Sequence, residues 1–383
     1  MRVALDGMLL SEQCSGVEFS IAQLARALAA HGRDAYRFFV PTRFAGMDAP
    51  AGDDRFRVVP TGVPGHVRLV RLFWEQVLLP RAAQRQGCTV LHAPGYLCPV
   101  ATSLPTVITV YDIMALTQPQ WCRPLNRLNY RRLLPASIRR ADCIVVPSRF
   151  TADELARRFP AARARVRVIP LGLRPGFRAA PEPRDGDDVA RLGASGPYIL
   201  FVGRLEPKKN LVRLVQAFGR LKQQAHIPHR LVLAGTPGWG RQALRQAIAA
   251  AGLRDRVVLT GFVPDAALPP LYRQADLFAF PSLYEGFGLP PLEAMACGTA
   301  AVVSREGALP EVTAGAAREV DAYDVQSIAD GLLELIRNRE RREALRRKGL
   351  ERAARFTWPP AVRALETVYR EAAQAGAGEA GQQ

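Results

Sequence analysis

Short apolar runs rich in β-branched and aromatic residues recur along the chain, and each precedes a stretch with helical periodicity. This alternation constrains the fold most, because strands separated by helices pair in parallel and bury both faces of their sheet. It predicts an α/β protein with two doubly wound, Rossmann-like domains. The expected strands are 1–7, 36–40, 56–60, 89–94, 106–112 and 143–148, then 198–202, 230–235, 256–261, 277–282 and 300–304.

A polar segment rich in proline and glycine, 179–197, separates the two series of strands and is typical of a linker. We therefore place the N-terminal domain at 1–178 and the C-terminal domain at 198–357. A charged helical segment at 358–374 follows, and we expect 375–383 to be disordered.

The chain has 383 residues, which is long enough for two domains with substantial cores. It contains no apolar run of 18 residues, and its first residues suit a strand better than a signal peptide. Its six cysteines lack paired spacing, which favours reduced thiols over disulfides or a zinc site. We expect a cytoplasmic protein.

The net charge of +17 is concentrated in the first half, where residues 1–180 contain 25 arginines and 12 acidic residues. Four of these arginines, named at the end of this paragraph, flank an expected short apolar helix that contains Leu69, Leu72, Phe73 and Trp74. Such a basic amphipathic surface can attract the anionic inner face of the cell membrane, unless the arginines only reflect composition. No nucleic-acid-binding motif accompanies the charge, so we expect no nucleic-acid partner. The flanking arginines are Arg68, Arg71, Arg81 and Arg85.

The apolar run Tyr198–Val202 ends at Gly203, and a basic loop leads from there into an amphipathic helix. Arg204 can contact phosphate oxygens through two N–H groups, and Lys209 supplies a point charge. Asn210 suits the N-cap of the following helix. This arrangement is how an α/β sheet presents cations at the carboxyl ends of its strands.

Two glutamates, Glu285 and Glu293, flank a second turn with seven residues between them. The turn is Gly286, Phe287 and Gly288, and Pro290 with Pro291 then suits the first turn of a short helix that stops at Cys297-Gly298. The free N–H groups of this helix would favour a phosphate or diphosphate. Carboxylates on either side would suit hydroxyl-rich groups, so the segment favours a nucleotide sugar as ligand.

The motifs VGRLEPKKN (202–210) and YEGFGLPPLEAM (284–295) together resemble family 4 of the retaining nucleotide-sugar glycosyltransferases. That resemblance implies the GT-B fold, in which two Rossmann-like domains face a central cleft. The N-terminal domain would bind the acceptor, the C-terminal domain would bind the nucleotide sugar, and the last helix would cross back to the N-terminal domain. Segments 74–80, 91–96 and 109–116 are most similar to bacterial O-antigen and exopolysaccharide mannosyltransferases.

The resemblance also implies roles for individual residues. Glu285 would contact the donor sugar, Glu293 the ribose hydroxyls, and the backbone near Phe262 and Val263 the base. Gly16 would approach the diphosphate from the N-terminal domain. The retained configuration would need no protein nucleophile, because the departing phosphate helps to remove the acceptor proton. The implied donor-binding residues are Gly16, Gly203, Arg204, Lys209, Phe262, Val263, Glu285, Gly286, Phe287, Gly288, Leu289 and Glu293; the catalytic ones are Glu285, Asp112, Arg204 and Lys209.

The implied reaction transfers a hexose from a nucleotide sugar to a lipid-linked or surface polysaccharide. The similarity to mannosyltransferases implies that the hexose is mannose and that the donor is GDP-mannose. Asp112 would orient an acceptor hydroxyl, with Tyr111, which stands where the family often has histidine, and His92 as further candidates. No cofactor or metal is expected, because Arg204 and Lys209 can neutralise the diphosphate. Asp185 and Asp187 have metal-ligand spacing but lie in the expected linker.

Two other functions remain open at the level of sequence. A glycoside hydrolase could use Glu285 and Glu293 as its acid and nucleophile. A non-catalytic nucleotide-binding protein at a membrane surface could keep the same polar residues. Sugar release without a nucleotide would support the first, and binding without turnover the second.

Overall fold

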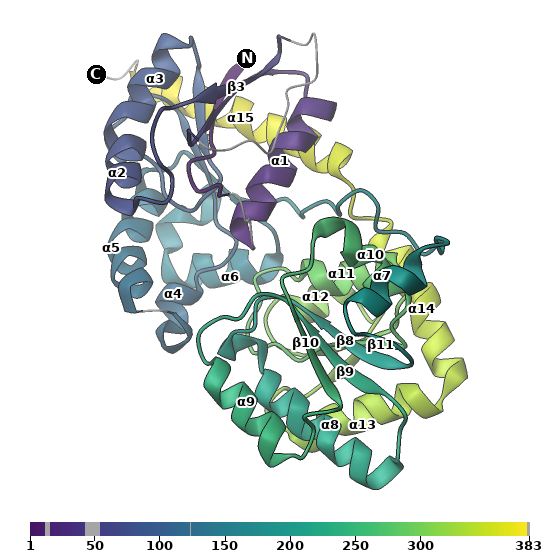
Figure 1. Ribbon diagram of the computed structural model, residues 1–383. Coiled ribbons are helices and arrows are strands. Elements are labelled where there is room, and N and C mark those ends of the chain that lie inside the picture. The colour runs from purple at the N-terminus through teal and green to yellow at the C-terminus, as the bar shows by residue number, and fades with distance from the viewer. Residues whose placement is uncertain (12–15, 43–53, 123, 381–383) are drawn as a thin grey trace. The chain divides into compact units, whose positions relative to one another are not determined.

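The computed structural model describes residues 1–11, 16–42, 54–122 and 124–380. The chain forms two compact units, shown in Figure 1. The first consists of Met1–Gly172 together with Thr357–Gln383, and the second is Leu173–Phe356. Within the described residues, no helix combines the length and the apolar character that crossing a membrane requires.

The first unit contains a parallel sheet in the order β3-β2-β1-β4-β5-β6-β7. Its strands are β1 (Arg2–Asp6), β2 (Ala35–Val40), β3 (Phe56–Pro60), β4 (Val90–Ala93), β5 (Thr106–Thr109), β6 (Cys143–Val146) and β7 (Val166–Val168). Its helices are α1 (Val17–His31), α2 (Arg68–Phe73), the π-helix η1 (Trp74–Leu78), α3 (Leu79–Arg85), α4 (Met114–Thr117), η2 (Pro119–Trp121), α5 (Pro124–Arg140), α6 (Arg149–Arg158), η3 (Pro160–Arg165) and α15 (Trp358–Ala380).

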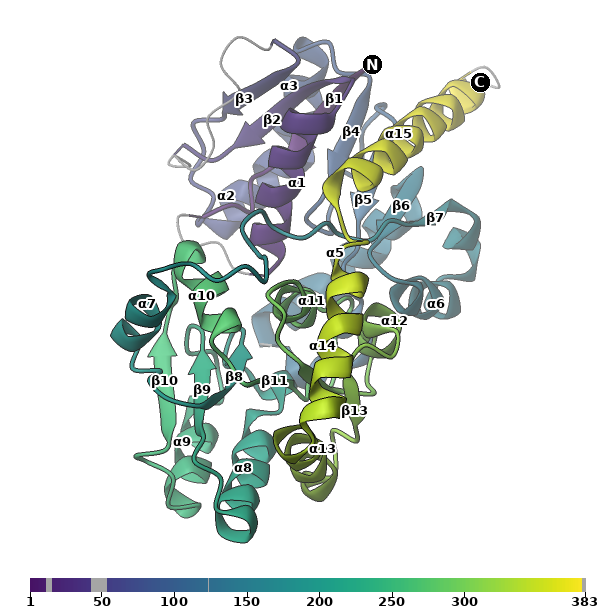
Figure 2. The same cartoon turned by 90° about the vertical axis from the view of Figure 1, so that its right-hand side faces the viewer.

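Side chains of the first sheet alternate between two cores, as the two-residue period of a strand requires. In β1, Val3 and Leu5 join the core that contains α1 and α15, whereas Ala4 joins the core on the other face. Figure 2 shows α1 and α15 beside the strands of this unit. Because both faces are covered, the central strands are mostly apolar, whereas the edge strands β3 and β7 each contain an exposed or half-buried arginine.

The second unit repeats the plan with a parallel sheet in the order β10-β9-β8-β11-β12-β13. Its strands are β8 (Tyr198–Val202), β9 (Arg230–Ala234), β10 (Val257–Gly261), β11 (Leu277–Phe280), β12 (Ala301–Ser304) and β13 (Arg318–Val320). Its helices are α7 (Asp185–Arg191), η4 (Pro207–Lys209), α8 (Leu211–Ala225), α9 (Arg241–Ala250), η5 (Asp265–Ala267), α10 (Leu268–Arg273), α11 (Leu289–Ala296), α12 (Leu309–Thr313), α13 (Val325–Arg337) and α14 (Arg339–Ala353).

Strand order reverses once in each sheet, between β1 and β4 in the first and between β8 and β11 in the second. In open α/β sheets, the loops at the carboxyl ends of the strands diverge at this switch point and leave room for a ligand. The fold therefore marks one place in each unit where functional side chains should collect.

The predicted α/β class with two Rossmann-like parallel sheets is confirmed. Strands β7 and β13 were not expected, because three residues are too few to establish a periodic pattern. The boundary at 178 was also placed too late, since the first unit ends at Gly172.

The linker proposed at 179–197 is wrong, because this segment belongs to the second unit and contains α7. Asp185 receives two hydrogen bonds from Arg273, at 2.7 and 2.6 Å, and these fasten α7 to α10. The disordered tail is corrected as well: 375–380 continue α15, and 381–383 lie outside the described residues.

Candidate functional site

Lys209 and Glu285 meet at the switch point of the second sheet. Lys209 follows β8 and Glu285 follows β11, and their Nζ and Oε1 atoms are 2.5 Å apart. The Ser282 hydroxyl donates to the same carboxylate oxygen at 2.6 Å. The Lys209 and Glu285 side chains are only 12% and 11% exposed. The two motifs chosen from the sequence therefore form one buried ion pair.

The pair holds its charges through mutual attraction. Burial by itself would raise the pKa of Glu285, but Lys209, Lys208 and the hydrogen bond from Ser282 outweigh burial and lower it. Burial lowers the pKa of Lys209, and the charge of Glu285 opposes that effect. An anion approaching Lys209 would compete with Glu285 for the same ammonium group.

Asn210 fastens the loop after β8 to the end of β11. Its side-chain amide donates to the carbonyls of Pro281, at 3.1 Å, and Ala322, at 2.6 Å, and its oxygen accepts a hydrogen bond from Arg213. Asn210 occupies the N-cap position of α8, as predicted, but its side chain makes no capping bond. Its φ of 60° is a left-handed conformation that asparagine tolerates better than most residues.

The glycine turn leads directly into α11, as predicted. Gly288 has a φ of 118°, and α11 begins at Leu289 with proline in its first turn. The helix ends at Ala296, and Gly298 adopts the left-handed conformation just beyond it. Because the two prolines after Leu289 have no N–H, the donors at the start of this helix are the backbone N–H groups of Gly288 and Leu289, three and four residues after Glu285.

Glu293 is fastened inside the second unit. Arg174 contacts one of its carboxylate oxygens through Nε, at 2.8 Å, and Nη2, at 2.7 Å, and the Tyr272 hydroxyl donates to the other at 3.0 Å. Sequence reasoning missed Arg174 and Tyr272. Arg174 directly follows the recognised segment VIPLGL, but nothing in its own spacing links it to a residue more than a hundred positions later.

Two of the remaining donor-side candidates are exposed. Arg204 is exposed and pairs with Glu206 at 3.2 Å, and Phe262 is exposed beside the buried Val263. Gly16 is the N-cap of α1 with a φ of 56°, and no atom of the described residues lies within 4 Å of the position of a β-carbon there. Their roles toward the nucleotide stay predictions.

His92 was wrongly chosen as an acceptor residue. It is fully buried in β4, where its ring nitrogens lie 2.9 Å from the Tyr369 hydroxyl and 2.8 Å from the Thr109 hydroxyl. Burial lowers its pKa to about 3. A neutral, enclosed imidazole of this kind supports the packing of α15 and cannot reach a substrate.

Tyr111 and Asp112 follow β5. Tyr111 is buried, and its ring meets Tyr96 edge to face at 5.6 Å, so its role as an acceptor contact is replaced by a packing role. Asp112 is half-buried and accepts a hydrogen bond from the backbone N–H of Met114, which starts α4. Its orienting role stays a prediction.

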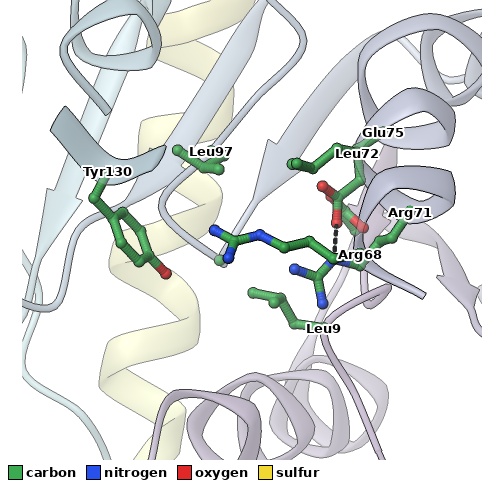
Figure 3. Close-up of a pocket in the computed structure, with 9 residues that line it drawn as sticks. Leu9, Arg68, Arg71, Leu72, Glu75, Leu97 and Tyr130 are labelled. Atoms are coloured by element: carbon green, nitrogen blue, oxygen red, sulfur yellow. Dashed lines mark ion pairs between the residues drawn. The ribbon is translucent and has the colours of Figure 1, made fainter. Parts of the chain in front are cut away.

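A pocket that sequence reasoning missed lies at the switch point of the first sheet (Figure 3). Its polar lining comes from β1, α2, η1 and α5, and its enclosed volume is only about 30 Å³. Glu75 and Arg71 form an ion pair at one side, at 3.4 Å, and Tyr130 lies at the opposite side. The arginines had been assigned only to a basic surface, because sequence spacing does not show that they adjoin Asp6 at the end of β1.

Comparison with known proteins agrees with this architecture. The family described as "Glycosyltransferase Family 4" matches residues 14–176, and "Glycosyl transferases group 1" matches residues 188–352. The O-antigen chain mannosyltransferase B of Escherichia coli is 33% identical over 70% of this chain and 71% of its own. A D-inositol 3-phosphate glycosyltransferase of Xylanimonas cellulosilytica is 30% identical over 93% of this chain and 92% of its own.

Among solved structures, sucrose-phosphate synthase from Thermosynechococcus elongatus superposes with a TM-score of 0.76. It covers 97% of this chain and 98% of its own at 22% identity, so the likeness concerns the fold. Together with the two family matches, these similarities define a glycosyltransferase with the GT-B fold. The chain belongs to glycosyltransferase family 4.

Proposed function

We propose that the protein transfers mannose from GDP-mannose to a lipid-linked or surface polysaccharide, with retention of configuration. The observation that carries the proposal is the buried pair of Lys209 and Glu285 beside the first turn of α11. The name of the E. coli relative supports mannose, whereas the inositol phosphate glycosyltransferase of comparable identity leaves the acceptor to experiment.

In the proposed reaction, the charge of the leaving diphosphate is taken up by Lys209, Arg204 and the backbone N–H groups of Gly288 and Leu289 at the start of α11. Glu285, held by Lys209 and Ser282, positions the donor sugar. The departing phosphate oxygen receives the acceptor proton, so neither a protein nucleophile nor a metal ion is required.

The hydrolase alternative is disfavoured by the states of the two glutamates. A retaining hydrolase needs one carboxyl group that stays protonated and one that is free to attack. The pKa of Glu285 is lowered by Lys209, and both oxygens of Glu293 are engaged by Arg174 or Tyr272. Neither glutamate is therefore suited to act as the general acid.

Thermal unfolding with equal concentrations of GDP, UDP, ADP and dTDP, without added metal, tests the donor. A ligand that binds only the folded protein stabilises it, so GDP should raise the melting temperature and the other nucleotides should not. Selective stabilisation by UDP would exclude GDP-mannose. An absence of response to every nucleotide would contradict the donor site.

We further propose that the first unit docks on an anionic membrane through the outer face of α2. Leu69 is 80% exposed and Phe73 is 59% exposed, and exposed arginines, Arg81 and Arg85, follow on α3. Apolar side chains beside cations match the lipid boundary and anionic headgroups of a bilayer surface.

Co-sedimentation with vesicles of phosphatidylglycerol and phosphatidylcholine tests this docking. Phe73→Ser should weaken binding at least as strongly as high salt does, whereas Val100→Ser, at another exposed apolar position of the same unit, should not. Equal binding by wild type and Phe73→Ser, or to vesicles without anionic lipid, would contradict it.

A further inference from the structure

Arg174 is a buried arginine that connects two of the predicted nucleotide-binding segments of the second unit. Its side chain is only 10% exposed, and its guanidinium group contacts Glu293 in α11. On its other side, Nη1 donates to Asp265 at 3.0 Å, in η5, which closely follows the expected base contacts at 262–263. The ring of Phe177 covers the guanidinium group, whose Cζ atom lies 4.4 Å from the ring centroid. Enclosed in this way, Arg174 holds its partners in one arrangement.

The charges of this cluster keep Arg174 and Tyr272 as hydrogen-bond donors toward Glu293. Burial alone would lower the pKa of Arg174, but Glu293 and Asp265 outweigh burial and raise it. Burial and the charge of Glu293 raise the pKa of Tyr272 well above its ordinary range. Near neutral pH, Arg174 therefore stays a cation and Tyr272 keeps its hydroxyl proton.

These donors use three of the four acceptor positions of the Glu293 carboxylate. A carboxylate has two such positions on each oxygen. Arg174 Nε, at 2.8 Å, and Nη2, at 2.7 Å, both face Oε1, and the Tyr272 hydroxyl donates to Oε2 at 3.0 Å. One position on Oε2 therefore remains for a ligand. Because the Glu293 side chain is only 4% exposed, a ligand meets it over a small area.

We propose that Arg174 is a positioning residue that limits Glu293 to a single ribose hydroxyl of the bound nucleotide. A ribose presents neighbouring hydroxyl groups at its 2′ and 3′ positions, and a free carboxylate could take both, one on each oxygen. Here Arg174 occupies Oε1, so only Oε2 accepts, and the second hydroxyl is left to other groups or to water. The inference rests on the proposed function, because it requires that Glu293 faces the ribose of the donor.

Isothermal titration calorimetry of the full chain with GDP, 2′-deoxy-GDP and 3′-deoxy-GDP tests this limit. One deoxy analogue should bind the wild type about tenfold or more weakly than GDP, the loss expected for one hydrogen bond to a charged group. The other analogue should bind within about threefold of GDP, because its missing hydroxyl is not held by a charged group. Equal affinities of the two analogues, whether both match GDP or both are weaker, would overturn the proposal.

Arg174→Lys should remove the preference between the two analogues. The lysine keeps a charge beside Glu293, which an uncharged side chain would leave buried and unpaired. A single ammonium group cannot reproduce the fork that occupies Oε1, so the carboxylate should accept both hydroxyls. The two analogues should then bind within about threefold of each other.

The ratio of the two affinities separates positioning from a merely structural role. Loosening of the site lowers the fraction of competent protein, which weakens every ligand by the same factor and leaves the ratio unchanged. An Arg174→Lys protein that keeps the wild-type ratio would therefore overturn the proposal. The ratio measured on the wild type is a test that needs no variant to fold.

Asp265→Asn is the matched control, because it removes the exposed partner of Arg174 and leaves both contacts to Glu293. Asp265 is 62% exposed. Its ion pair should contribute little, so the variant should bind GDP within about threefold of the wild type and keep the wild-type ratio. Loss of the ratio in this variant would show that the contact with Glu293 is not what sets it.

The same titrations with UDP and its two deoxy analogues keep the two proposals distinguishable. If GDP binds and its analogues are equal, the inference about Arg174 is wrong and the donor site stands. If only the uridine series binds, the GDP-mannose proposal fails, and the ratio within that series decides the role of Arg174. If no nucleotide binds, the donor assignment and the inference are both overturned.

Discussion

Lys209 and Glu285 are individually unremarkable residues whose pairing defines the donor side of this protein. Each lies in the segment that follows a strand, and the parallel pairing of β8 and β11 brings the two segments together. Burial makes the pair sensitive to the loss of either partner, because the remaining charge has little access to water. Substitutions at this pair should therefore change both stability and nucleotide binding.

Lys209→Met should weaken GDP much more than guanosine, because only the diphosphate needs the ammonium group. The expected loss for GDP is about 1.5–3 kcal/mol, the usual value for a hydrogen bond to a charged group. Isothermal titration calorimetry with both ligands measures the difference, and Lys222→Met serves as a control on the far end of α8. An unchanged affinity for GDP would show that the donor site is misassigned.

His92 should make the protein sensitive to acid. Its pKa is about 3 in the folded protein against an ordinary value of 6.5, so between these values the unfolded chain binds a proton that the folded chain does not. Stability is therefore lost as the pH falls below 6.5, by about 2 kcal/mol at pH 5. Urea unfolding at pH 7 and pH 5 measures this loss.

His92→Gln should be less stable than the wild type at pH 7, but it should lose less further stability on acidification. The glutamine can keep one of the hydrogen bonds and does not titrate. Parallel losses in both proteins would mean that other groups cause the acid sensitivity.

At the scale of elements, α15 completes a unit that begins more than 350 residues earlier. Val362, Leu365, Val368 and Tyr369 are all buried in the same core as α1. Glu366 adds polar contacts, because it accepts hydrogen bonds from the Tyr36 hydroxyl and the backbone of Arg33. The helix is therefore part of the first unit's core.

A chain that ends at 357 should fail to fold stably. Removing four buried apolar side chains costs about 1.5–3 kcal/mol each, which together exceeds much of the stability of an ordinary domain. A chain that ends at 374 is the matched control, and its melting temperature should stay within a few degrees of the full chain. Cooperative unfolding of the shorter chain at an unchanged temperature would contradict this role for α15.

At the scale of the whole molecule, two Rossmann-like units carry different kinds of site. The second unit offers cations and a helix N-terminus, which suit a diphosphate, and the first contains a small pocket lined by acidic and basic side chains beside a helix with exposed apolar residues. This division follows from two sheets of the same topology whose switch-point loops differ in sequence.

Hydrogen exchange with and without GDP should show whether the nucleotide binds to the second unit, as proposed. Binding should slow exchange at 203–210 and 285–293, because these loops become ordered around the diphosphate. Helix α6 of the first unit is the internal control and should not change. Additional protection near Gly16 would support its predicted contact, whereas protection concentrated at the pocket of Asp6 and Glu75 would contradict the donor assignment.

The sequence by itself determined the elements and the donor motifs. Strand periods, the glycine turn and the prolines of α11 are local signals, because each depends on the backbone preferences of neighbouring residues. The resemblance carried by 202–210 and 284–295 also predicted the fold correctly. Such short-range signals nevertheless miss three-residue strands and place a helix such as α7 in a linker.

Only the tertiary structure decided which side chains meet. Glu293 pairs with Arg174 across 119 positions, and His92 turned from a candidate site residue into a core residue when α15 covered it. Asp6 and Glu75 line one pocket only because the end of β1 and the π-helix η1, which are far apart in the chain, converge at the switch point of the first sheet. Long-range contacts of this kind depend on strand order and burial, which no local pattern contains.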